Sequence, residues 1–122
     1  MRMPAQRFED LIVWQKAHAL TLRVYKVTKA FPRDELFGLT SQMRRAAVSV
    51  AANIAEGFSK KSKTDKTRIF NIAQGSLEEL RYFFVLAKDL AYVPSDSEWD
   101  DLNEVARMLG AYVREISLDA RR

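Results

Sequence analysis

The chain has 122 residues, 48% of them hydrophobic, and a formal net charge of +4, so we expect residues 1–122 to form a single domain that can bury a core. It contains no cysteine, which excludes disulfides, thiolate metal sites and a cysteine nucleophile, and its four glycines and three prolines leave little room for the turns of a β-rich domain. It has neither an apolar run of about 18 residues nor an apolar signal segment, so we expect a cytoplasmic protein with no membrane partner.

Apolar residues recur at helical spacing in four segments, which predict helices over about residues 10–30, 35–56, 63–91 and 96–118. Pro32 ends the first segment, because the residue before a proline is pushed out of the α region. Asp34 is then placed to cap the second helix. Gly57 follows that helix, where a left-handed C-terminal residue is easiest to adopt.

Two pairs of residues have the spacing of a capping box. Ser62 with Asp65 opens the third predicted helix, and Ser95 with Glu98 opens the fourth, after Pro94 has closed the third. Because the four amphipathic helices are joined by tight connections, we expect an all-α fold, an antiparallel up-down-up-down four-helix bundle.

The second and third predicted helices carry a polar stripe beside their apolar one. In the second helix, the apolar positions are Leu39, Met43, Ala47, Val50 and Ile54. The polar stripe lies one position away, roughly 100° around the helix. A buried polar group without a partner costs about 1 to 3 kcal/mol, so we interpret this stripe as a hydrogen-bonded structural seam. The seam comprises Gln42, Ser49, Asn53, Glu56, Ser76 and Glu79.

Glu79 is an unusual member of the seam, because it falls on the apolar repeat of the third helix. We expect it to face Arg45 or Asn53 across the bundle within a structural network, since an isolated buried carboxylate is too costly to keep charged. Two alternatives stay open: in the first, Glu79 belongs to an ion or ligand site, and in the second, it is half-exposed near a subunit boundary.

Three segments of the chain resemble a known family: FEDLIVWQKA (8–17), FPRDELFGLTSQMRRAAVSVAANIAEG (31–57) and QGSLEEL (74–80). They are similar to proteins encoded by intervening sequences in bacterial large-subunit ribosomal RNA genes, in order and over nearly the whole chain. The resemblance implies a four-helix bundle assembled into a homo-oligomeric ring, with a pentamer favoured. A more distant similarity is to the accessory proteins of diversity-generating retroelements, which bind nucleic acid and a reverse transcriptase.

The residues that match the family pattern include no known catalytic residue. They are Gln42, Arg44, Arg45, Ser49, Asn53, Glu56, Gly57, Ser76 and Glu79. An enzyme is also disfavoured by the residue inventory. A bundle di-iron site needs two Glu-x-x-His pairs, which the single histidine, His18, cannot supply, and the chain has no G-x-S-x-G elbow. We therefore expect no catalytic residue, no metal and no cofactor.

Basic residues gather where the second predicted helix gives way to the third. The candidates for nucleic-acid binding are Lys60, Lys61, Lys63, Lys66 and Arg68, with Arg44 and Arg45 farther up the second helix. Residues 36–77 carry seven basic and two acidic residues, whereas residues 78–122 carry six basic and ten acidic. We predict that an oligomer repeats this patch and binds RNA or DNA through phosphates, largely without sequence preference. The alternative is a solvated basic loop.

A second class of function is a structural or adaptor protein whose partner is another protein. Six aromatic residues exceed what four thin core stripes easily hide, and some of them are candidates for a subunit interface. These are Trp14, Phe37, Tyr82, Phe84, Tyr92 and Trp99. An adaptor predicts an apolar or acidic groove that stays empty in the oligomer, whereas a nucleic-acid binder predicts a continuous basic surface.

Overall fold

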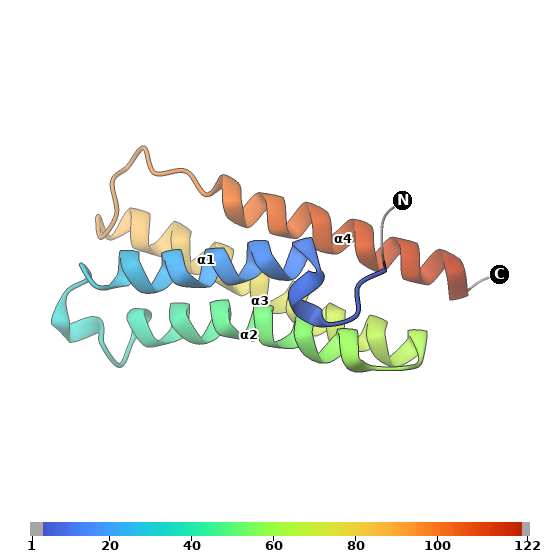
Figure 1. Cartoon of the computed structure of the whole chain (residues 1–122). Helices are drawn as coiled ribbons and strands as arrows, with labels where there is room; N and C mark the ends of the chain where they lie inside the picture. Colours follow the sequence, from blue (N-terminus) through green and yellow to red (C-terminus); the bar gives the residue numbers. More distant parts are fainter. Residues whose placement is uncertain (1–3, 121–122) are drawn as a thin grey trace.

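The computed structural model describes residues 4–120, which form four α-helices and no strand. The helices are α1 (Ile12–Thr28), α2 (Leu39–Ser59), α3 (Lys63–Asp89) and α4 (Asp100–Ala120), and short 3₁₀ turns at Phe8–Asp10 and Arg33–Glu35 precede α1 and α2. The helices run in alternating directions, so the α1–α2 and α3–α4 loops lie at one end and the α2–α3 turn at the other (Figure 1). Each helix packs against the next, and α4 returns to α1. The predicted all-α four-helix bundle is confirmed.

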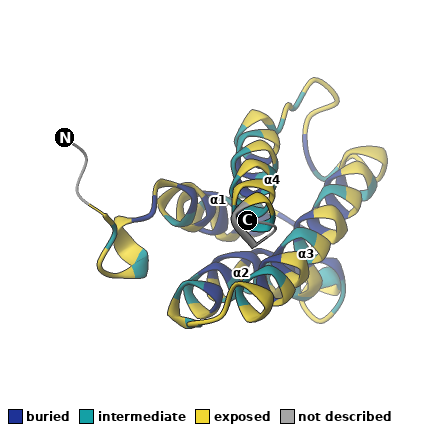
Figure 2. Ribbon diagram, turned by 90° about the vertical axis from the view of Figure 1, so that its right-hand side faces the viewer, coloured by how far each residue is buried: buried dark blue, intermediate teal, exposed yellow. Residues whose placement is uncertain are grey.

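The core lies on the sides of the helices that face one another (Figure 2). Its largest fully buried side chains include Leu20, Met43, Ile54, Phe70, Leu77, Leu80, Leu102 and Leu109, drawn from all four helices. Each such side chain contributes about 1.5 to 3 kcal/mol by leaving water. The helical spacing of apolar residues therefore predicts the core well. Among the described helices, none is long and apolar enough to cross a membrane.

Helix α2 begins four residues later than predicted, at Leu39. The residues after Pro32 form a 3₁₀ turn instead, and Gly38 precedes the first helical residue. The prediction that Asp34 caps the second helix is wrong, because the Glu35 carboxylate accepts the hydrogen bond from the Leu39 amide at 3.2 Å. A 3₁₀ turn brings a side chain three to four residues back within reach of the free amides at a helix start.

The two predicted capping boxes have opposite outcomes. Ser62 caps α3, since its hydroxyl accepts a hydrogen bond from the Asp65 amide at 3.1 Å. The predicted start of the fourth helix at residue 96 is wrong, because α4 begins at Asp100 and Pro94 instead accepts a bond from Ser97 in a turn. The following segment places Trp99 half-buried against the core.

Trp99 lies just before α4 and packs between side chains of α1 and α3. Its ring stacks on Phe84 with centroids 3.3 Å apart, and the Arg23 guanidinium lies 4.0 Å above its centroid. Arg23 also pairs with Asp101 of the first turn of α4 at 2.6 Å. These contacts hold the start of α4 against α1 and α3.

Gly57 does not adopt the predicted left-handed conformation. It lies inside α2, it is buried, and none of the glycines among residues 4–120 has a positive φ. A Cβ at this position would lie 2.6 Å from Cε1 of Phe70. The glycine is therefore required by the close approach of α3 and not by a turn.

Candidate nucleic-acid interface

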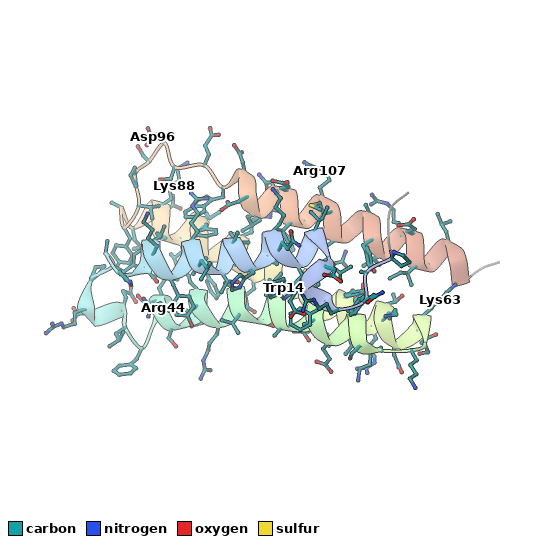
Figure 3. All side chains as sticks on the ribbon, in the orientation of Figure 1. Trp14, Arg44, Lys63, Lys88, Asp96 and Arg107 are labelled. Atoms are coloured by element: carbon teal, nitrogen blue, oxygen red, sulfur yellow. The ribbon has the colours of Figure 1, made fainter. Side chains whose placement is uncertain are left out.

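The α2–α3 turn reverses the chain within three residues. Helix α2 ends at Ser59, Lys60 is extended, and its amide donates to the Gly57 carbonyl at 3.2 Å. Ser62 then caps α3, so that Lys60, Lys61 and Lys63 lie together at one tip of the bundle, where Figure 3 labels Lys63. The tight turn and not the helix periodicity groups these three lysines at one end of the bundle.

Lys66 is used inside the turn. Its Nζ donates to the carbonyl oxygens of Gly57 at 3.2 Å and Phe58 at 2.7 Å, and it lies 5.4 Å from the centroid of the Phe58 ring. Desolvation by burial lowers the pKa of the Lys66 ammonium below its usual value. Lys66 satisfies the last carbonyls of α2, where a cation is also favoured by the helix dipole. Because its ammonium is bonded within the turn, Lys66 is not one of the proposed phosphate contacts.

Of the other cations of the turn, Lys60 is half-buried, whereas Lys61, Lys63 and Arg68 are exposed. Lys60 lies 3.8 Å from the Glu56 carboxylate, in an i,i+4 pair that is worth little at the surface. Lys61, Lys63 and Arg68 are exposed and take part in none of the ion pairs that the described residues form. Residues 56–68 carry five cations and two carboxylates, so the tip keeps a positive charge.

Arg44 and Arg45 do not join this cluster. Arg44 lies 15 residues before Ser59, which places it about 22 Å away along α2, and Figure 3 shows Arg44 and Lys63 toward opposite ends of the bundle. On the single chain, the cations predicted to bind nucleic acid therefore form two separate groups.

The corner between α1 and α2 groups Arg44 with residues that the sequence analysis did not single out. Lys29 and Arg33 line the same hollow as Arg44, beside Thr28 and Thr40. The residues are spread over the end of α1, the connecting turn and the start of α2. No single helical period unites them, so only the path of the turn brings them together.

Part of the polar seam is a compact hydrogen-bonded group between α2 and α3. The hydroxyls of Ser49 and Ser76 are 2.7 Å apart, and Asn53 donates from Nδ2 to the Ser49 carbonyl at 2.8 Å and to its hydroxyl at 3.0 Å. All three residues are half-buried. They fit the structural role that the seam predicts.

The other seam residues, Gln42, Glu56 and Glu79, are exposed. Glu79 and Arg45 line one hollow, but within residues 4–118 neither forms an ion pair or a side-chain hydrogen bond that joins them. Glu79 thus faces Arg45 as predicted, but the described residues of the single chain show no bonded network around it, and its exposure fits the alternative that was left open. The offset of roughly 100° from the apolar stripe carries long side chains outward to water, whereas short ones stay at the core boundary.

The six aromatic residues divide between core and surface. Phe84 is buried, and Trp14, Tyr92 and Trp99 are half-buried against the core. Phe37 is 93% exposed and Tyr82 is 58% exposed. The single chain thus leaves two of these aromatic side chains in water.

His18 is an exposed residue whose ring stacks on Trp14, with centroids 5.0 Å apart and planes 6° from parallel. Within the described part of the chain, no group of three or more histidine, aspartate or glutamate residues is placed to hold a metal ion. The geometry brings forward cationic and aromatic surface groups as the candidates for function.

A family model described as 23S rRNA-intervening sequence protein matches residues 9–111. The match spans α1, α2, α3 and the first half of α4, and it includes the whole basic turn. No curated protein matches the chain. The resemblance that the sequence segments suggested is confirmed.

Proposed function

The chain belongs to the family of 23S rRNA-intervening sequence proteins, and on that premise we propose that it is a non-enzymatic protein that binds RNA or DNA without sequence preference. The observation that carries the proposal is the group of lysines at the α2–α3 tip, where Lys61 and Lys63 are exposed and Lys60 is half-buried beside them. Arg68 extends the cluster by one and a half turns of α3.

The chemistry of the tip favours phosphate over base recognition. Lysine is a flexible point charge that contacts phosphate without a fixed geometry, and phosphate contacts carry no sequence information. Lys66 supports the tip from behind, because it ties the end of α2 to the start of α3 and so holds the turn in one shape. The turn is thus preorganised, while the side chains of its outer lysines can adjust to the phosphates of a nucleic-acid backbone.

The proposal includes assembly into a homo-oligomeric ring, with a pentamer favoured. The family resemblance supports it, and so does the exposure of Phe37 and Tyr82, since large aromatic side chains are enriched at subunit interfaces. A ring repeats the basic tip in every subunit. Contacts that are weak singly then add, because later contacts form at high effective concentration.

The test is a salt series on the charge-reversal variant Lys60→Glu/Lys61→Glu/Lys63→Glu. Fluorescence anisotropy with labelled single-stranded RNA and DNA of unrelated sequence should show steep salt dependence for the wild type. Each lost phosphate contact should reduce the slope of log affinity against log salt concentration by about 0.7, so the slope of the variant should be smaller by about 2. Its affinity should fall equally for all sequences.

A matched control keeps the same change in charge. Lys26→Glu/Lys88→Glu/Arg107→Glu alters three exposed cations that lie outside the turn and outside the ion pairs of the described residues. Its smaller effect would separate a local interface from nonspecific attraction by net charge. Equal loss in both variants would contradict the assignment to the tip.

A protein adaptor is the second candidate, and the exposed Phe37 is the observation that favours it. If the wild-type protein retains neither RNA nor DNA at about 50 mM salt, where phosphate-driven binding is strong, the nucleic-acid proposal fails and the adaptor takes its place.

A further inference from the structure

The corner between α1 and α2 contains a second concentration of positive charge, far from the lysine tip. A hollow of about 330 Å³ opens there, and its polar and charged lining residues are Thr28, Lys29, Arg33, Thr40 and Arg44. We call it the corner hollow. Three of these residues are cations and none is acidic, and the described ion pairs include none of the three.

The guanidinium of Arg44 is already held in place at the edge of the corner hollow. Its Nε donates to the Thr28 hydroxyl at 2.9 Å, and the group lies 4.7 Å above the centroid of the Tyr25 ring. Thr28 in turn donates to the Val24 carbonyl at 2.7 Å, so its hydroxyl is fixed as the acceptor for Arg44. Neither Nη group of Arg44 has a hydrogen-bond partner among residues 4–118. Two ordered donors therefore remain for a ligand.

Thr40 gives an independent indication of a ligand. The described residues include three buried threonines, and two of them, Thr21 and Thr28, bond their hydroxyls to backbone carbonyls. Thr40 is only 3% exposed and lines the corner hollow, yet its hydroxyl makes no hydrogen bond within the described residues. The residue is buried, but its unbonded hydroxyl stays accessible from the hollow and can bond to a group held there.

The start of α2 adds backbone N–H groups, whose partial positive charge favours an anion. The amides of Thr40 and Ser41 have no hydrogen-bond acceptor among the described residues, whereas the Leu39 amide is capped by Glu35. The Glu35 carboxylate is also the acceptor of the Tyr92 hydroxyl at 2.8 Å, so both its oxygens are already engaged by protein donors. The last carbonyls of α1 are partly neutralised as well, because Val27 and Thr28 accept bonds from Ala30 and Phe31. A helix start with free amides and adjoining cations attracts an anion.

We propose that the corner hollow is an oxyanion site that takes a phosphate group. Arg44 supplies fixed guanidinium donors, Thr40 its hydroxyl and backbone amide, and Lys29 and Arg33 the neutralising charge. A phosphate has several acceptor oxygens and a charge that these groups match. The site goes beyond the proposed function, since it lies about 22 Å along α2 from the lysine tip and requires no nucleic acid.

The test is a titration of the full chain with inorganic phosphate at constant ionic strength, balanced with sodium chloride and followed by amide NMR. The Thr40 and Ser41 amide signals should shift and saturate. Thr40→Val should weaken binding about three- to tenfold, as expected for loss of one hydrogen bond, and should leave the unfolding midpoint unchanged or raised because the hydroxyl has no protein partner. Arg44→Gln should weaken binding tenfold or more, as expected for loss of a charge-assisted bond.

Arg45→Gln is the matched control, because Arg45 is the next residue but does not line the corner hollow, and it should bind phosphate within about twofold of the wild type. The lysine-tip variant Lys60→Glu/Lys61→Glu/Lys63→Glu should also retain phosphate binding, which separates this site from the nucleic-acid proposal. Shifts that fail to saturate, or that are unchanged in both Thr40→Val and Arg44→Gln, would overturn the site.

A second pair of probes identifies the source of the phosphate group. One short oligonucleotide is added with a 5′-phosphate and with a 5′-hydroxyl. Shifts at Thr40 and Ser41 with the first alone assign the site to a terminal phosphate, and equal shifts with both assign it to backbone phosphates. If inorganic phosphate alone produces the shifts, the site takes free phosphate.

Discussion

At the scale of single residues, the packing of Gly57 against Phe70 shows how one absent methyl group sets the distance between two helices. Phe70 is fully buried, and the atoms of its ring come within 2.6 to 3.1 Å of the position that a Cβ on residue 57 would occupy. Neither the ring nor the α2 backbone can move without disturbing the core, because protein interiors are close-packed. Helix α3 therefore depends on glycine at this position.

Gly57→Ala should accordingly destabilise the protein by about 1 to 3 kcal/mol through overpacking. Urea denaturation measures the change, and Phe70→Leu in the same chain should remove part of the penalty by making room. Gly75→Ala is the matched control, because nothing lies within 4 Å of a Cβ there. It should stabilise α3 by about 0.5 to 1 kcal/mol, and equal destabilisation of both variants would contradict the packing argument.

The polar seam leads to a second residue-scale prediction. Asn53→Ala removes two hydrogen bonds to Ser49 from a half-buried site and should cost about 0.5 to 1.5 kcal/mol. Glu79→Ala changes an exposed side chain and should stay within about 0.5 kcal/mol of the wild type. The thermal or urea unfolding midpoints of the two variants measure these changes in stability. A large loss for Glu79→Ala would show that the oligomer buries this carboxylate.

At the scale of the secondary-structure elements, the C-terminus of α3 carries a local conformational cost. Ala91 has a φ of 62°, the single positive value outside glycine within residues 4–120. The Tyr92 amide donates to the Ala87 carbonyl at 2.9 Å, and the Ala91 amide to the Lys88 carbonyl at 3.0 Å. This is the paired bonding of a Schellman motif, in which glycine usually takes the left-handed position.

Ala91→Gly should therefore stabilise the protein by about 1 kcal/mol, since a Cβ in the left-handed region costs roughly 1 to 2 kcal/mol and glycine gives back part of this through chain entropy. Ala111→Gly is the control, because Ala111 is an exposed residue inside α4. That variant should lose about 1 kcal/mol. If Ala91→Gly also destabilises the protein, the left-handed conformation of Ala91 does not persist in solution.

At the scale of the whole molecule, charge and exposed aromatic groups are unevenly distributed. The basic tip is at the α2–α3 end, the corner hollow is at the other end, and the acidic excess lies in residues 78–122. Phe37 projects from the α1–α2 connection with 93% of its surface exposed. A surface of this kind suits contact between unlike faces of identical chains.

We expect light scattering at micromolar concentration to show a homo-oligomer, with a mass near 70 kDa for the favoured pentamer, about five times the 14.0 kDa of one chain. Higher salt should weaken any contribution from charge between subunits. A mass of one chain would remove both the ring and the additive phosphate contacts that depend on it.

The sequence by itself determined the four helices and the core, because apolar residues every three to four positions leave a bundle as the way to remove them from water. The family was identified separately, from the resemblance of three sequence segments. Ser62 shows that a cap can be predicted when donor and acceptor are three residues apart. Tertiary structure alone decided where Lys66 and Arg44 are used, why residue 57 is glycine, and which seam residues are buried. Those outcomes depend on contacts between helices that are distant in sequence, and a helical repeat specifies the face of a residue but not the atoms that lie opposite it.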